Sequence, residues 1–261
     1  MHISRTGFRN RVTSGLLKHM SAEPLPTVDA IPHRIERTLN RHSRATLDHD
    51  GTVIIRLARR LTQSQEQSHI TSLLRRMAGV VAKEQTMIPI DPFRPLLEGA
   101  TETILTFGDG RTRVVRLHAG PRTSFRQRDG IWLLTIGPHI QRRSLHRLLW
   151  NMIAKQEMAF VESLVDDLND RTLQVDLRTI RMRLMSSRWG SCSSTGAITL
   201  NTALLFLPKP TLEYVIIHEL AHRIHPNHSR HFWKTVEGVI PEYRQIRKDQ
   251  HRFRLPNNQL P

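Results

Sequence analysis

Apolar and polar positions follow a recurring pattern along the first two thirds of the chain. Residues 44–57 alternate around a turn and predict two paired strands, and apolar positions spaced three and four apart predict a helix over 70–81. The same order recurs when 122–136 predict a second hairpin and 144–168 predict a second helix. Another hairpin is predicted over 102–117. The pattern therefore indicates a hairpin-helix unit that is used twice.

The last third of the chain predicts shorter strands and a closely spaced series of helices. Residues 175–182 and 198–200 are typical of strands. Pro208 and Pro210 predict the first turn of a helix that runs to about Ile224, because proline lacks only an N–H that is unpaired there anyway. A second helix is predicted over 229–239, and Pro241 opens a third. The mixture of separate strands and helices predicts the α+β fold class.

These elements suggest four regions. Residues 1–43 form a basic segment expected to be a disordered tail and linker, and residues 1–22 contain no Asp or Glu. An acid-poor start is also typical of organelle transit peptides. Residues 44–168 form an N-terminal hairpin-helix region, 169–254 a C-terminal domain, and 255–261 a tail.

Composition narrows the classes of protein further. Lys and Arg number 39 against 23 Asp and Glu, and the formal net charge of +16 favours anionic partners such as nucleic acid, nucleotides or acidic lipid. The single cysteine, Cys192, excludes an intramolecular disulfide and a multi-cysteine zinc cluster. No apolar run approaches the roughly 20 residues of a membrane span, and no signal-peptide core is present, so a cytoplasmic protein is expected. The oligomeric state stays open.

Five of the 15 histidines lie between His218 and His231, and two of them form the motif His-Glu-x-x-His. Residues four apart lie on one face of a helix, so the rings of His218 and His222 can bind one metal ion together. Glu219 is rotated away from that line and can reach a water on the metal. Zn²⁺ fits this donor set best because it accepts nitrogen ligands and keeps one position open.

A third ligand is expected beyond a break in this helix. His228 follows His222 by six positions, the spacing of an extended zinc motif, although His225 stands where that motif has glycine. His225 is the main competitor as third ligand, and Glu237 or Glu242 are others, since sites with two histidines and one glutamate exist. The alternative without a metal is that the histidines simply pack in the core.

The segment before this helix holds further candidates. Arg188 to Cys192 predicts a turn with a packed aromatic ring, and Cys192 is either a small buried thiol or, less simply, a nucleophile or ligand. Arg188, Tyr214 and Tyr243 are candidates to stabilise a developing oxyanion. The sequence does not choose among them.

Taken together, these motifs resemble the YgjP-like metallopeptidase family, which is related to the SprT and WLM proteases. The likeness covers roughly 45–253 and rests on the following segments: Arg-Trp-Gly-Ser-Cys-Ser-Ser at 188–194, Ile-Thr-Leu-Asn at 198–201, Tyr214 with 218–222, Asn-His-Ser at 227–229, Phe-Trp at 232–233 and Pro-Glu-Tyr-Arg at 241–244. Glu242 stands where the family often has Asp, and 85–99 match poorly.

The resemblance implies a zincin-like domain, a small sheet with an active-site helix, preceded by the β-hairpin and helix region. It implies that His218, His222 and His228 hold Zn²⁺ and that Glu219 is the general base. The function expected is a zinc-dependent metallopeptidase that hydrolyses peptide bonds in a peptide or protein substrate, with the strand at 198–200 offering an edge to it.

Two alternatives stay open. Arginines near the motif could attract a phosphoanhydride such as a nucleoside triphosphate, although no GxxxxGK[ST] phosphate loop is present; they are Arg178, Arg181, Arg183, Arg188 and Arg223. A nucleic-acid-binding module, with catalysis absent or DNA-gated, is the other, although the basic residues are spread along the whole chain.

Overall fold

The computed structural model describes residues 27, 30–48 and 51–256, and it divides into two compact units, Met1–Ala82 and Lys83–Pro261. The expected tail over 1–22 lies outside the described residues, as does 257–261 of the expected C-terminal tail. No helix in the described ranges is both long enough and apolar enough to cross a lipid bilayer.

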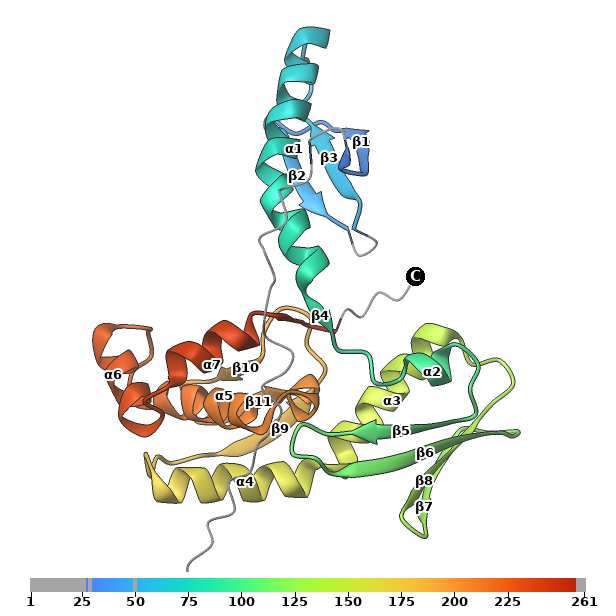
Figure 1. Cartoon of the computed structure of the whole chain (residues 1–261), viewed down its shortest axis with the longest axis vertical. Coiled ribbons are helices and arrows are strands. Elements are labelled where there is room, and N and C mark those ends of the chain that lie inside the picture. Colours follow the sequence, from blue (N-terminus) through green and yellow to red (C-terminus); the bar gives the residue numbers. More distant parts are fainter. Residues whose placement is uncertain (1–26, 28–29, 49–50, 257–261) are drawn as a thin grey trace, which may run out of the picture. The chain divides into compact units, whose positions relative to one another are not determined.

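The first unit is a small sheet covered by one helix (Figure 1). Its elements are β1 (His33–Arg37), β2 (Arg44–Leu47), β3 (Val53–Leu57) and α1 (Gln63–Thr86). The hairpin of β2 and β3 and the helix confirm the pattern prediction. The expectation of an unstructured segment up to residue 43 is wrong for His33–Arg37, because β1 pairs in parallel with β3 and the neighbouring Ile31 is buried in the core of this unit.

The second unit begins with a four-stranded sheet. Its first elements are β4 (Ile88–Pro89), α2 (Arg94–Leu97), β5 (Glu102–Thr106), β6 (Thr112–Ala119), β7 (Ser124–Arg128) and β8 (Ile131–Ile136). The sheet order is β5-β6-β8-β7, and both predicted hairpins are present as antiparallel pairs.

The helix predicted over 144–168 is two helices, α3 (Arg142–Gln156) and α4 (Met158–Arg171). The break lies at Glu157, whose φ of −96° and ψ of 2° leave the helical range. Its side chain is 3% exposed and pairs with Arg111 at 2.6 Å. A buried carboxylate is costly unless it is paired, so this ion pair holds the chain at the break.

The remaining elements surround the helix that carries the histidine motif. They are β9 (Thr179–Arg183), β10 (Gly190–Cys192), β11 (Ala197–Asn201), the 3₁₀ helix η2 (Thr202–Phe206), α5 (Lys209–Ala221), α6 (Arg230–Val239), α7 (Tyr243–Gln250) and β12 (Phe253–Arg254). As predicted, α5 has a proline in its first turn, and α6 begins directly after Ser229. β12 pairs in parallel with β4.

A three-strand arrangement recurs three times, where the sequence indicated two copies. In each case the third strand is central, parallel to the first and antiparallel to the second: β3 with β1 and β2, β8 with β6 and β7, β11 with β9 and β10. A long helix follows each time, α1, α3 or α5. The third copy therefore places α5 beside its own small sheet.

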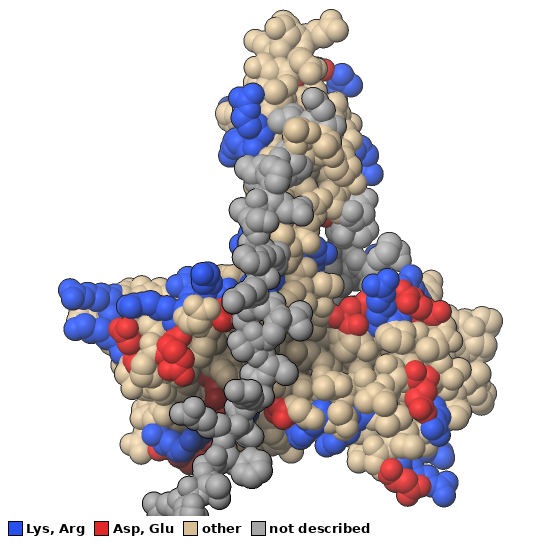
Figure 2. Space-filling model, in the orientation of Figure 1, with Lys and Arg blue, Asp and Glu red and all other residues tan. Residues whose placement is uncertain are grey.

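One continuous core runs through the second unit. It includes residues from Ile90 to Tyr243, and α5 packs within it against α4, α6, α7 and β10. The expected division between 44–168 and 169–254 falls inside this unit, and its functional meaning stays a prediction. On the face shown in Figure 2, acidic and basic side chains are interspersed over the second unit.

Candidate metal centre

The first two candidate ligands lie one turn apart at the end of α5. The rings of His218 and His222 have centroids 4.9 Å apart, as the four-residue spacing predicts. The helix ends at Ala221, and one more turn follows in which the N–H of His225 donates to the carbonyl of Ala221 at 2.9 Å. The rings of both histidines therefore lie on the same face of the helix.

The chain then turns back and brings His228 to these two rings. Its Nε2 lies 3.0 Å from Nε2 of His218, and the ligand nitrogens of all three histidines lie within 4.8 Å of one another. Ser229 caps α6, since its hydroxyl accepts from the N–H of Phe232 at 3.3 Å, and this fixes the residue next to His228. Two ligands about 2.05 Å from a tetrahedral metal ion lie about 3.3 Å apart, and the 3.0 Å separation of His218 and His228 is close to that spacing.

The competing third ligands lie elsewhere. Nε2 of His225 is 3.2 Å from the hydroxyl of Thr235, and Glu237 pairs with Arg244 at 3.3 Å. Glu242 is exposed before the first turn of α7. Among the described residues, only His218, His222 and His228 gather in this way.

Neighbouring groups orient the three imidazoles. Nδ1 of His222 lies 3.2 Å from the carbonyl oxygen of His225, a contact in which the ring N–H donates and Nε2 is left for a metal. The ring of Phe232 lies among all three histidines, at centroid distances of 4.6–4.9 Å. Trp233 stacks on His228 at 5.6 Å. The rings are therefore held in place by packing.

Burial also favours the neutral, metal-binding form of His218 and His228. It lowers the pKa of His218 to about 3, with help from the neighbouring His222 and His228. The pKa of His228 is lowered by the same cause, together with the charges of His222 and Arg247. A neutral imidazole has a free lone pair, so His218 and His228 can each offer a nitrogen to a cation at neutral pH.

Glu219 lies beside the cluster as a buried acid. Its side chain is 5% exposed, and no hydrogen-bond partner is found for its carboxylate within the described ranges. Burial raises the pKa of Glu219 to about 8, and the charge of Arg188 acts in the opposite direction. A carboxyl group with a pKa near neutrality can both accept and return a proton, as a general base must.

Glycine at position 190 leaves room for this carboxylate. A Cβ atom there would lie 2.5 Å from Oε1 of Glu219 and 2.8 Å from its Cγ. We expect Gly190→Ala to displace Glu219 and to lower kcat by about tenfold or more, because misplacing a catalytic group by about 1 Å is that costly. Steady-state kinetics on a peptide substrate measure this.

The matched control is Gly238→Ala, since a Cβ at that position meets nothing within 4 Å. If Gly190→Ala kept the wild-type kcat, the position of Glu219 would not depend on the absence of a Cβ atom at residue 190. Circular dichroism and metal content of both variants separate this effect from misfolding.

The cluster opens into a cavity of about 530 Å³, lined by His218, Glu219 and His228 together with side chains from α5, α6, α7 and the loop before β10. Two of the three oxyanion candidates, Arg188 and Tyr214, line it, but Tyr243 does not. Burial raises the pKa of Tyr214 to about 12, so its hydroxyl keeps its proton and can donate.

Asn201 holds the loop that carries Arg188, a role that the sequence analysis missed. It is fully buried, and its amide nitrogen donates to the carbonyls of Met185 at 2.7 Å and Arg188 at 2.9 Å. A lone asparagine at a strand end gives no local sign of contacts 13 and 16 residues earlier.

The structure disfavours the lesser alternative for Cys192 and corrects the edge expected at 198–200. Cys192 does not line the cavity, and burial raises the pKa of its thiol, which disfavours a nucleophilic thiolate. The strand at 198–200 is not an edge, because β11 pairs with β9 on one side and with β10 on the other. The edge next to α5 belongs to β10.

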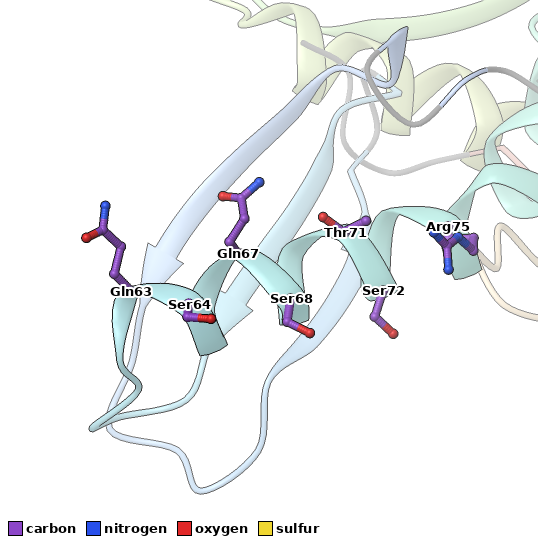
Figure 3. Close-up of a pocket in the computed structure, with 7 residues that line it drawn as sticks. All are labelled: Gln63, Ser64, Gln67, Ser68, Thr71, Ser72 and Arg75. Atoms are coloured by element: carbon purple, nitrogen blue, oxygen red, sulfur yellow. The ribbon is translucent and has the colours of Figure 1, made fainter.

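A second hollow lies on α1 in the first unit (Figure 3). It is lined by glutamines, serines, a threonine and one arginine between Gln63 and Arg75. None of these side chains is a usual metal ligand or a general base at neutral pH, so the hollow is not the candidate centre.

A helix that presents two histidines, a third histidine returning to them and a buried glutamate define a metal-dependent hydrolase. The family model described as YgjP-like, metallopeptidase domain, matches residues 41–252. The chain therefore belongs to the YgjP-like metallopeptidase family, and it is a metal-dependent peptidase.

Two solved structures, both metallopeptidase zymogens, show local likeness. Abylysin of Pyrococcus abyssi is 33% identical, with 34% of this chain and 90% of that chain covered and a TM-score of 0.32. Jannalysin of Methanocaldococcus jannaschii is 21% identical, with 34% and 92% covered and a TM-score of 0.32. No curated protein matches the chain.

Proposed function

We propose that the chain is a zinc-dependent peptidase in which His218, His222 and His228 hold the ion and Glu219 is the general base. The observation that supports this most strongly is the convergence of three imidazole nitrogens within 4.8 Å of one another, beside a buried carboxylate. The family membership supports a metal and a peptide substrate. The zincin-like architecture is part of the same proposal.

Zinc suits this donor set. Three neutral nitrogen ligands with one open position are typical of catalytic zinc sites, whereas Mg²⁺ and Ca²⁺ require oxygen ligands. Once bound, the ion would supply a Lewis acid for the substrate carbonyl and for the attacking water.

The chain's own groups would move the proton and stabilise charge. Glu219 takes a proton from the attacking water as the water oxygen forms the new C–O bond, and then passes this proton to the amine nitrogen as the peptide C–N bond breaks. Tyr214 and Arg188 line the same cavity and would donate hydrogen bonds to the carbonyl oxygen as it becomes negative. The edge of β10 opposite β11, which pairs with no strand of the described ranges, would pair with the main chain of an extended substrate.

The test is hydrolysis of a diverse mixture of unstructured peptides by the purified chain, after chelation and again after one equivalent of zinc. We expect cleavage that disappears with chelator and returns with zinc, read by mass spectrometry of the products. The same samples are assayed for phosphate release from nucleoside triphosphates and for cleavage in the presence of DNA.

Three outcomes separate the alternatives. Peptide cleavage that requires zinc and does not require DNA supports the proposal. Phosphate release without any peptide product would replace it with the phosphoanhydride hypothesis. Peptide cleavage only with DNA would replace it with the DNA-gated one.

A further inference from the structure

Two arginines line the metal-site cavity without a salt bridge to an acid of the described ranges, although the charge of Arg188 acts on Glu219. Arg188 lies in the loop before β10 and Arg247 lies on α7, and neither forms an ion pair with any acid in the described ranges. Glu219 is the one acid that lines this cavity, and it is the proposed base. The cavity therefore has an excess of positive charge that the residues around it do not neutralise.

Aromatic stacking holds Arg247 beside the metal cluster. Its guanidinium carbon lies 4.8 Å from the centre of the Trp233 ring. Trp233 in turn stacks on Tyr243 at 5.3 Å and on the ligand candidate His228 at 5.6 Å. A guanidinium that rests on a fixed indole loses little freedom when it binds an anion, so this group is preorganised.

Gln250 adds an unused donor to the same place. It follows Arg247 by three residues on α7, so the two share a face of the helix. Its side chain is 5% exposed and lines the cavity, and its amide nitrogen has no hydrogen-bond partner. A buried donor left unpaired is destabilising, and a ligand that accepts from it removes this penalty.

We propose that Arg247 and Gln250 form a carboxylate-binding subsite next to the metal, with Arg188 adding to its positive field, so that the enzyme selects peptides that carry a carboxylate beside the scissile bond. This inference rests on the proposed peptidase function. A carboxylate matches the two donors because its oxygens accept in-plane hydrogen bonds from a guanidinium and an amide. The carboxylate has two sources, the C-terminus of the substrate or the side chain of Asp or Glu.

The test uses matched peptides. One pair has the same sequence with a free or an amidated C-terminus, and a second pair, blocked at both ends, has Glu or Gln at one internal position. We expect the wild-type kcat/KM to be about ten- to hundredfold higher for the carboxylate member of one pair, the effect of one charge-assisted hydrogen bond. The pair that shows the preference identifies the source.

Variants of α7 then test whether Arg247 and Gln250 produce the preference for the carboxylate peptide. Arg247→Ala and Gln250→Leu are each expected to reduce the ratio of kcat/KM between the two members of that pair by about tenfold, mainly through KM. Lys248→Ala is the matched control on the same helix, because Lys248 is an exposed cation of α7 that does not line the cavity. It is expected to leave the ratio unchanged. Arg247→Lys keeps the positive charge but loses the paired N–H donors of the guanidinium. It tests the same subsite if Arg247→Ala is unstable.

The outcomes distinguish this proposal from the peptidase function. If no peptide is cleaved, the proposed function fails. If the wild-type kcat/KM is equal for both members of each pair, the peptidase function stands and the carboxylate subsite is wrong. The same holds if the Arg247 and Gln250 variants lower kcat/KM for both members in the same proportion.

Discussion

Replacing Glu219 by glutamine is expected to lower kcat for peptide hydrolysis by about 10²–10⁴-fold while the protein keeps its metal. Glutamine has nearly the same size, so it fills the buried space beside Gly190 without disturbing the packing of α5. It cannot accept the proton of the attacking water, so the chemical step loses its base. Product formation measured by mass spectrometry, with metal content measured on the same sample, checks both parts.

The control for this variant is Glu213→Gln on the same helix. Glu213 pairs with Lys209 at 3.6 Å and does not line the cavity, so its replacement should leave turnover unchanged. Unchanged turnover in the Glu219 variant would assign the proton transfer to another group. Loss of metal in it would instead give Glu219 a structural part in the cluster.

The histidine cluster was predictable because most of its geometry is local. A spacing of four on a helix fixes the relation of His218 to His222, whatever surrounds the helix. The position of His228 followed from a proline break and a spacing of six, and the structure brings its ring to the other two. That these three bind a metal stays a prediction.

The hairpins were also predictable, because turn residues between alternating strands act over a few positions. The break at Glu157 was not, since it depends on Arg111, 46 residues earlier. Strand β1 was missed for a similar reason, because its parallel partner β3 is separated from it in the sequence by β2, the first strand of the hairpin. Such elements are stabilised by contacts that no short window of sequence contains.

The rest of the cavity depends on contacts of the same long-range kind. Gly190 was expected only to form a turn, but it leaves room for a side chain 29 residues later. Arg247 and Gln250 drew no attention in the sequence because neither belongs to a motif, and they line the cavity only because α7 packs against α5. Residues that complete a site from a distant helix therefore require the folded structure.

Replacing His228 by alanine is expected to weaken zinc binding by about 10²-fold or more, since changes that merely disturb the orientation of a ligand already cost about 10- to 100-fold. Two histidines on one helical turn remain, but they offer too few ligands for a tight site. In the wild-type chain, zinc at 100 times its dissociation constant stabilises the fold by about 2.7 kcal/mol. The variant should lose most of the zinc-dependent rise in melting temperature.

Calorimetric titration with zinc and thermal melts with and without chelator measure the two effects, and His225→Ala and His231→Ala are the controls. His225 contacts Thr235 and His231 is exposed, and neither belongs to the cluster, so both variants should bind zinc as tightly as the wild-type chain. If the His228 variant still bound one equivalent of zinc with wild-type affinity, the third ligand would have to be another residue. If the His225 variant lost the metal instead, that residue would be His225, and the 3.0 Å approach of His228 to His218 would have to be explained as a hydrogen bond between two rings.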